Sequence, residues 1–297
     1  MYHKPVLLNE SIEGLVLFPD GTYVDGTYGG GGHSAAILKR MKEGRLFAFD
    51  QDEDALVNKI EDERLVLINH NFRYLKNFLK YYDAVPVDGI LVDLGVSSHQ
   101  FDSDVRGFSM RNDASLDMRM NRRQTKTAKM ILNEYPESDL KNIFWQYGEL
   151  NEAPAIAAAI AKARAVHSIS IFRELEKAIG FLAPRGSENK FFARVLQALR
   201  IEINQEIEAL KAFLMQAADV LKSGGRLVII SYHSLEDRIA KNFIKAGNFE
   251  GIPEKDFFGN EKKIFRTINR KPIVPSPMEI EENNRSRSAK LRIAEKI

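Results

Sequence analysis

Short apolar runs of strand length recur along the chain, and their spacing defines the expected fold. Four of them fall at residues 22–24, 44–52, 64–72 and 87–98, separated by intervals long enough for helices. This alternation predicts an α/β protein with a parallel, doubly wound sheet. A fifth strand is expected at residues 224–231, and a closing pair at 264–268 and 289–294.

More than 100 residues separate the fourth and fifth expected strands, which is longer than any α/β connection requires. We therefore expect an inserted helical domain at 104–211, and a discontinuous ligand-binding domain at 1–103 and 212–297. Helices opened by cap-type residues are predicted at 138–147, 151–164 and 170–182. Apolar residues at steps of three and four run from Leu196 to Leu221 and predict one continuous stripe serving as core and hinge.

A loop rich in proline and acidic residues, 272–282, is expected to be mobile between the two closing strands. The strongest local signal lies earlier, where Gly29 to Gly32 follow the first strand and Ser34 offers a cap for a helix. Glycines without a Cβ let a ligand approach the backbone at a helix N-terminus. Taken alone, such a turn serves NAD, FAD, S-adenosylmethionine and phosphates alike.

An acid follows the second expected strand about 20 residues beyond the glycines, where nucleotide-binding α/β units bind ribose hydroxyls. That residue is Asp50. The alternative is that Asp50 caps a helix starting near Ala55, a task that Asp52 or Asp54 could also perform.

The composition excludes several kinds of chemistry. The chain has no cysteine, which rules out disulfides, Fe–S clusters, thiolate zinc sites and a cysteine nucleophile. No cluster of metal-ligand residue types is evident. No apolar run reaches the length of a membrane span, and residues 1–5 do not begin a signal peptide, so a cytoplasmic location is expected. The formal charge of +2 conceals two basic segments, residues 106–129 and the run from Arg285 onward.

Eight segments, in order along the whole chain, resemble the RsmH (MraW) family of bacterial small-subunit ribosomal RNA cytosine-N4 methyltransferases. They are HKPVLLNE at 3–10, DGT through GGHS at 25–34, DLGVSSHQ at 93–100, RGFS at 106–109, LDMRM at 116–120, QALRI at 197–201, SYHSLEDR at 231–238 and RSRS at 285–288. Residues 189–194 and 112–115 depart from the usual family sequences. Both departures lie in or beside the insertion and leave the cofactor assignment unaffected.

The resemblance implies a class I S-adenosylmethionine-dependent (Rossmann-like) methyltransferase fold with an inserted helical domain for RNA recognition. It implies methylation of the exocyclic amine of a decoding-centre cytidine, position 1402, in 16S ribosomal RNA. The implied partner is this RNA or the small subunit, with no membrane, and a homodimer is an open option. The residues that match cofactor-contacting positions are Gly31, Gly32, His33, Asp50, Phe72, Asp93 and Gln100. For His33 we favour contact through the backbone over contact through the ring.

A cytosine amine is a weak nucleophile, so an acceptor for its proton is needed. The candidates are a Ser97 or Ser98 hydroxyl, a loop carbonyl, and Asp117 from the insertion, with Asp93 shared between cofactor and amine. The absence of cysteine independently favours N4 over C5 of cytosine, because C5 methylation ordinarily needs a thiolate.

Tyr232 or His233 is expected to stack on an extruded base, with the three charged residues at 236–238 capping the next helix. Phosphate contacts are expected from Arg106, Arg119, Arg285 and Arg287. A Ser-His-Asp hydrolase is disfavoured, since no nucleophile elbow accompanies the histidine. The remaining alternatives are a methyltransferase acting on another RNA amine, an NAD-dependent oxidoreductase, whose regular glycine spacing is missing, and a non-catalytic RNA-binding assembly factor.

Overall fold

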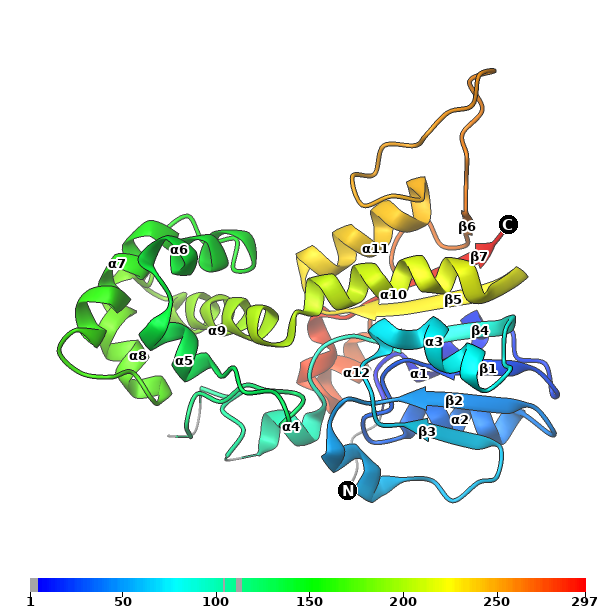
Figure 1. Ribbon diagram of the computed structural model, residues 1–297, viewed down its shortest axis with the longest axis horizontal. Helices are drawn as coiled ribbons and strands as arrows, with labels where there is room; N and C mark the ends of the chain where they lie inside the picture. The colour runs from blue at the N-terminus through cyan, green and yellow to red at the C-terminus, as the bar shows by residue number, and fades with distance from the viewer. Residues whose placement is uncertain (1–4, 104, 111–113) are drawn as a thin grey trace. The chain divides into compact units, whose positions relative to one another are not determined.

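The computed structural model describes residues 5–103, 105–110 and 114–297 (Figure 1). Outside these ranges lie His3 and Lys4 of the first family segment, and Asn112 and Asp113 of the atypical turn. The chain forms two compact units: the sheet unit, residues 1–95 and 207–297, and the helical unit, residues 96–206. These boundaries precede the expected ones, 103/104 and 211/212, at both ends of the insertion.

The sheet unit contains a seven-stranded sheet in the order β3-β2-β1-β4-β5-β7-β6. Five strands run parallel: β1 (Thr22–Asp25), β2 (Arg45–Phe49), β3 (Leu65–Ile68), β4 (Val87–Asp93) and β5 (Leu221–Ser231). The closing pair, β6 (Phe265–Thr267) and β7 (Lys290–Lys296), is antiparallel, so the sheet is mixed. The β1–β4 neighbourhood reverses the strand order, which is where open α/β sheets bind ligands at the strands' carboxyl ends.

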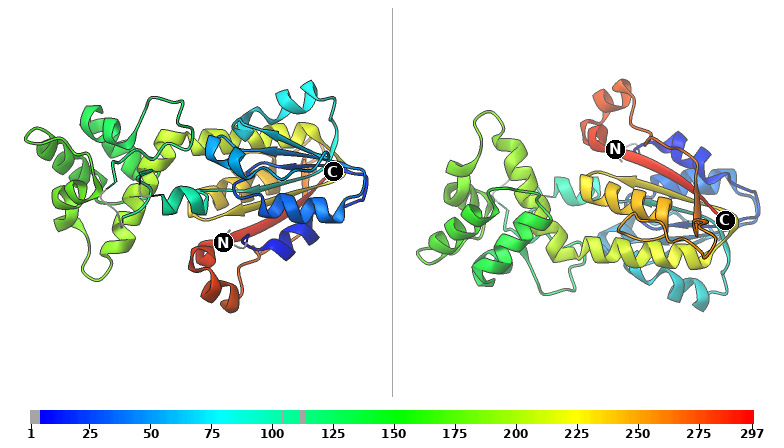
Figure 2. Two further views of the ribbon diagram at one scale, coloured as in Figure 1. Left: turned by 90° about the horizontal axis from the view of Figure 1, so that it is seen from below. Right: turned by 90° about the horizontal axis from the view of Figure 1, so that it is seen from above.

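Alternating strand residues supply two cores, one on each face of this sheet. Phe47, Phe49 and Val92 belong to one core, and Leu46 and Leu91 belong to the other. The first face is covered by α3 (Leu75–Tyr81), α10 (Glu206–Val220) and α11 (Ser234–Ala246), and the second by α1 (Leu8–Leu15) and α2 (Gly32–Arg40) (Figure 2). Successive side chains of a strand point to opposite faces, so a sheet that is buried on both sides needs apolar residues at both sets of positions.

Short helices complete the sheet unit and correct one expectation. They are η1 (Glu53–Asn58), η2 (Phe72–Tyr74), α12 (Pro277–Glu282) and η4 (Asn284–Ser288). The proline-rich segment expected to be a mobile loop therefore contains a capped helix, in which Ser276 Oγ accepts from the Glu279 N–H at 3.2 Å. Glu279 also accepts a 2.8 Å hydrogen bond from the Leu7 N–H, which ties this segment to the start of α1.

The helical unit has a separate hydrophobic core built by its own helices. They are α4 (Ser98–Asp102), α5 (Ala128–Glu134), α6 (Glu137–Gln146), α7 (Ala153–Arg164), α8 (Phe172–Ile179), η3 (Gly180–Leu182) and α9 (Glu188–Asn204). The expected caps of α6, α7 and α8 were wrong, because these helices begin after Pro136, Glu152 and Ile171. At α8, the Glu174 carboxylate accepts from the Ser170 and Ile171 N–H groups instead.

The long apolar stripe is divided between two helices. Gln205 adopts a left-handed conformation, with φ of 49°, and ends α9 before α10 begins. Leu199 of α9 then packs in the core of the helical unit, whereas Leu214 of α10 packs in the core of the sheet unit. Leu221 begins β5. This break explains why the second unit boundary precedes the expected one. No helix in the described ranges is long and apolar enough to cross a bilayer.

Candidate active site at the carboxyl ends of the strands

The glycine loop joins β1 to α2 with a conformation that only glycine adopts easily. Gly31 is the N-cap of α2 and has φ of +76°. A Cβ at Gly31 would lie 2.7 Å from the Tyr28 hydroxyl oxygen, and one at Gly32 would overlap the Pro5 ring. The backbone angle at Gly31 and the lack of space at both glycines therefore exclude side chains. Without side chains, the backbone N–H groups at the start of the helix stay accessible.

Asp50 follows β2 and faces this loop. Its Oδ2 accepts from the Gly29 N–H and its Oδ1 from the Asp52 N–H, both at 2.8 Å. Burial raises the pKa of Asp50 to about 6, against the lowering effect of these two bonds. The cap of η1 is Asp52, which accepts from the Asp54 N–H at 3.2 Å, so Asp50 does not serve as that cap. Each carboxylate oxygen has a second lone pair, which leaves Asp50 able to accept ribose hydroxyls.

Asp93 ends β4 and has partners from two other elements. The Tyr232 hydroxyl donates to Oδ1 at 2.8 Å, and His33 Nδ1 lies 3.9 Å from Oδ2. The Asp93 N–H donates to Thr27 Oγ1 at 2.7 Å, which fixes the backbone at this point. Burial raises the pKa of Asp93 to about 6, although His33 and Tyr232 act in the opposite direction. Such a value suits a group that must accept a proton near neutral pH.

Asp25, at the end of β1, is a third acid of this site that sequence reasoning did not assign. It is 1% exposed, and burial raises its pKa. Its oxygens accept from Ser34 Oγ at 2.6 Å and from the Thr27 N–H at 3.1 Å. The available signal was its position: Asp25 follows an apolar strand and precedes the glycine loop, as Asp50 and Asp93 follow theirs.

The ring of His33 is buried among protein partners. Nε2 lies 3.1 Å from the Val6 carbonyl oxygen, and Nδ1 faces Asp93. Phe72 is the first residue of η2, after β3. It is half-buried, and its ring centroid lies 5.3 Å from that of Phe213. The structure thus places Gly31, Gly32, His33, Asp50, Phe72 and Asp93 in the sheet unit. Their cofactor contacts stay predictions.

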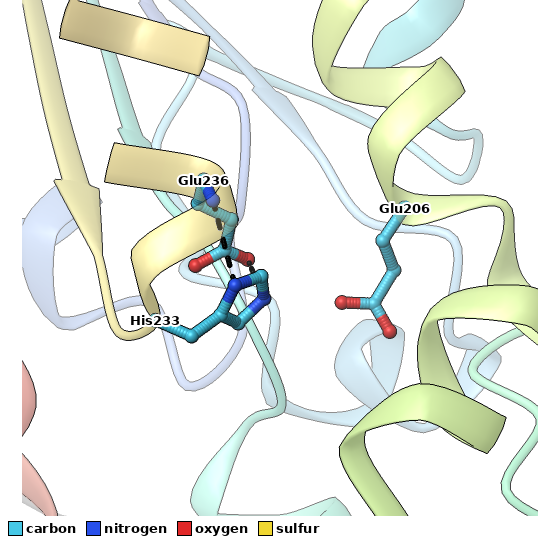
Figure 3. Close-up of side chains that lie close together, drawn as sticks. All are labelled: Glu206, His233 and Glu236. Atoms are coloured by element: carbon cyan, nitrogen blue, oxygen red, sulfur yellow. Dashed lines mark hydrogen bonds and ion pairs between the residues drawn. The ribbon is translucent and has the colours of Figure 1, made fainter. Parts of the chain in front are cut away.

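The segment after β5 supplies Tyr232 and His233. His233 is the N-cap of α11, and its Nδ1 accepts from the Glu236 N–H at 3.4 Å. Its Nε2 lies 3.1 Å from Glu236 Oε1, and the two side chains point toward each other (Figure 3). Capping of this helix by residues 236–238 was wrong in part, because Asp237 binds Arg292 Nε at 2.7 Å instead. Base stacking by Tyr232 or His233 stays a prediction.

Other predicted site residues belong to the helical unit. Ser97 and Gln100 form a capping box at α4: Ser97 Oγ accepts from the Gln100 N–H at 3.2 Å, and Gln100 Oε1 accepts from the Ser97 N–H at 3.0 Å. Both side chains thus have a structural task, and their predicted roles stay untested. The side chain of Ser98 lies outside what the structure describes.

Asp117 and Arg119 form a two-pronged ion pair. Arg119 Nε donates to Asp117 Oδ1 at 2.8 Å, and its Nη2 donates to Oδ2 at 2.7 Å. Burial pushes the pKa of Asp117 upward, but the bonds from Arg119 prevail and hold it below its usual range. Arg119 Nη1 also donates to the Gln124 carbonyl oxygen at 2.6 Å, so its guanidinium is largely engaged within the unit.

Burial of Arg106 disfavours its expected phosphate contact, which stays a prediction. Its side chain is 2% exposed, and Nη2 donates to the carbonyl oxygens of Arg119 at 2.9 Å and Met120 at 3.2 Å. Burial of the guanidinium against these carbonyl groups makes Arg106 a structural residue. Arg287, in η4, is exposed and Arg285 is half-buried, so phosphate contact by these two stays a prediction.

Comparison with known proteins identifies the family of the chain. A model of the MraW methylase family matches residues 1–297. The chain belongs to the MraW methylase family. This confirms the family resemblance inferred from the eight segments. The protein is accordingly a methyltransferase that uses S-adenosylmethionine.

Two relatives of this MraW-family methyltransferase carry the name ribosomal RNA small subunit methyltransferase H. The one from Christiangramia forsetii is 55% identical over 297 residues, which is 100% of this chain and 98% of the relative. The one from Bacteroides thetaiotaomicron is 57% identical over 296 residues, covering 99% of this chain and 97% of the relative. A solved structure, an rRNA methylase from Streptococcus thermophilus, aligns at 13% identity with a TM-score of 0.44, covering 100% of this chain and 99% of that one.

Proposed function

We propose that the protein transfers a methyl group from S-adenosylmethionine to the N4 amine of the decoding-centre cytidine at position 1402 of 16S ribosomal RNA, in the cytoplasm. The observation that carries this proposal is the full-length similarity, above half identity, to relatives named as methyltransferases of small-subunit ribosomal RNA. The family segments of the sequence favour cytosine N4 as the acceptor atom. The absence of cysteine is a second, independent argument against C5.

The residues at the strand ends fit the cofactor in chemistry and in space. Gly31 and Gly32 leave no room for a Cβ and present a helix N-terminus, which suits the carboxylate of an amino-acid moiety. Asp50 retains acceptor capacity for ribose hydroxyls, and Phe72 offers an aromatic surface for a base. Asp93, with a pKa of about 6, is ionised at neutral pH and would attract a sulfonium cation at the strand end.

The cofactor supplies an electrophilic methyl group on sulfur, so the protein's task is to position the amine and manage its proton. As the new N–C bond forms, the C–S bond breaks and the amine nitrogen must lose a proton. Asp93 is the acceptor that best meets this need, because its pKa of about 6 leaves it ionised yet basic at neutral pH. Oδ2 is the better placed oxygen, since Oδ1 already accepts from Tyr232.

The other candidate acceptors are less suited to this task. Asp117 is held in its ionised form by Arg119, which lowers its basicity. The Ser97 hydroxyl accepts a hydrogen bond from the Gln100 N–H. Among its described contacts there is no base that could take its own proton, so it is a poor acceptor for the proton of the amine. We therefore assign the proton to Asp93 and treat the two helical-unit residues as structural.

The proposal is tested by mapping N4-methylcytidine in 16S RNA from cells that lack the gene and cells complemented with it. Mass spectrometry of RNA fragments should show the modification at position 1402 only with the intact gene. A matched pair of variants separates catalysis from expression: Asp93→Asn should fail to restore the modification, and Asp219→Asn, at an exposed ion pair with Lys76, should restore it fully. Modification that persists without the gene, or that appears at another base, would refute the assignment.

A further inference from the structure

A hydrogen bond links the ends of two neighbouring strands beside Asp93. Tyr232 comes directly after β5, and its hydroxyl reaches Oδ1 of Asp93, the last residue of β4, at 2.8 Å. The backbone of Tyr232 is also fixed, because its N–H donates to Glu236 Oε2 at 3.0 Å. The Leu94 N–H donates to the Ile230 carbonyl oxygen at 3.0 Å and extends the β4–β5 pairing up to this contact. Tyr232 is therefore fixed both at its backbone and at its hydroxyl.

We propose that Tyr232 is a positioning residue for methyl transfer: its hydroxyl occupies Oδ1 of Asp93, fixes the carboxylate plane, and leaves Oδ2 to receive the proton of the substrate amine. This inference rests on the proposed function and deepens it, since it divides the work of the two carboxylate oxygens. It also gives Tyr232 a task other than stacking on a base.

Tyr232 acts as a donor and not as a base. Burial in the first place, and the neighbouring Asp93 charge in the second, raise the pKa of the Tyr232 phenol well above its ordinary value. The phenol therefore stays protonated throughout the neutral range and presents its O–H to Asp93. A base at this position would need the opposite shift, so proton uptake falls to the carboxylate.

Burial has the largest effect on the protonation of the Asp93 carboxylate, and four neighbouring groups modify it. His33 from α2 and Tyr232 favour the ionised form, whereas Asp25 from β1 and Glu236 from α11 disfavour it. His33 lies 3.9 Å from Oδ2, beyond hydrogen-bond distance, so the bond from Tyr232 is the direct side-chain contact to the carboxylate among these four. Its removal takes a donor from the ionised form and should raise the pKa of Asp93.

The test is Tyr232→Phe, which keeps the ring and removes one oxygen. The first readout uses cofactor-free, full-length protein labelled with carbon-13 at aspartate Cγ, with the Asp93 signal assigned by its loss in Asp93→Asn. We expect the Asp93 titration midpoint to rise by about one pH unit. The second readout is the pH profile of methyl transfer, in which the acid limb of kcat should move upward by the same amount, while the Kd of S-adenosylmethionine changes less than about twofold.

Tyr23→Phe is the matched control. Tyr23 is also fully buried, and its hydroxyl accepts from the Phe18 N–H at 2.7 Å near the start of β1. This variant should leave the Asp93 midpoint and the pH profile where they are. An unmoved Asp93 midpoint in Tyr232→Phe would overturn the role of Tyr232 alone. A wild-type protein that methylates no small-subunit RNA at any pH would instead overturn the proposed function, whatever the titration shows.

Discussion

Two aspartates, one in each unit, show how the same side chain is prepared for different tasks. Asp117 in the helical unit is bound through both oxygens by the Arg119 guanidinium, and its pKa lies below the usual range. Asp93 in the sheet unit contacts a phenol and an imidazole, and burial raises its pKa to about 6. Both lie within family segments of the sequence, and both were candidate proton acceptors.

The difference lies in the charge of the partner. An arginine stabilises the ionised carboxylate, satisfies its lone pairs, and leaves a weak base with a structural role. A neutral donor holds the carboxylate in place without cancelling its charge, so it remains available to a cation or a proton. The strand-end acids Asp25, Asp50 and Asp93 all have raised pKa values, because desolvation disfavours their charged forms. Such clusters mark functional sites more often than structural ones.

The largest expected effect separates the two aspartates by activity. Asp93→Asn should lower the rate of methyl transfer by at least about a hundredfold, because the amide cannot take up the amine proton. Asp117→Asn should stay within about tenfold of the wild-type rate, since any loss would come only from a less rigid helical unit. Initial rates of transfer of a labelled methyl group to small-subunit RNA measure both. Equal losses in the two variants would show that Asp93 and Asp117 do not differ in their part in methyl transfer.

The second effect is on stability, and its sign should differ between the two sites. The folded-state pKa of Asp93 is raised from 3.8 to about 6. At pH values above about 6 the charged form of Asp93 therefore lowers the free energy of unfolding by about 3 kcal/mol. Asp93→Asn should recover much of this at pH 8, and the gain should fall below about 1 kcal/mol by pH 4, where the carboxyl is protonated in the folded state.

Asp117 provides the opposite sign. Its depressed pKa means that it stabilises the fold above the unfolded-state value of 3.8 and that this contribution is lost as the pH falls. Asp117→Asn should therefore lower the free energy of unfolding at pH 8 by about 1–2 kcal/mol, because an amide cannot accept both arginine bonds. Urea unfolding at pH 8 and pH 4 measures both variants. A destabilised Asp93→Asn at pH 8 would show that the strand-end charge is compensated.

The sequence was sufficient for features that depend on local pattern. Short apolar runs predicted the strands, and acids at their ends predicted Asp50 and Asp93 at the strand ends. Asp25 also lies at the end of an apolar strand, but it was not predicted as a site residue, because the prediction at this position concerned the glycine loop. Ser34 turned out to donate to Asp25 at 2.6 Å and not to cap α2, whose N-cap is Gly31.

Features that depend on distant packing could not be predicted. The break at Gln205 has no glycine or proline to announce it, and both helices continue the same apolar period, so only their separate cores reveal it. Arg106 follows the charge pattern of a surface segment, yet it is buried by carbonyl groups of residues 119 and 120. The bond from Tyr232 to Asp93 joins residues 139 apart, which only the order of strands in the sheet brings together.

The remaining prediction tests whether the glycine loop differs from an ordinary turn. Gly31→Ala should destabilise the protein by about 1–2 kcal/mol for its left-handed backbone alone. The new Cβ would also lie 2.7 Å from the Tyr28 hydroxyl oxygen, which must shift or break its bonds to the Asn58 carbonyl oxygen and the Ile60 N–H. We therefore expect a further loss of stability and at least a tenfold weaker Kd for S-adenosylmethionine, measured by calorimetry.

Gly186→Ala is the matched control, because Gly186 has the same φ of +76° and no atom within 4 Å of the added Cβ. It should show the backbone cost without the contact, and cofactor affinity should not change. The difference between the two variants in thermal unfolding then isolates the close approach at Gly31 from the strain that both share. If the two variants lose equal stability and bind the cofactor equally well, the lack of space at Gly31 has no part in holding the ligand. The strand-end acids would then be the feature that distinguishes the sheet unit from the helical unit.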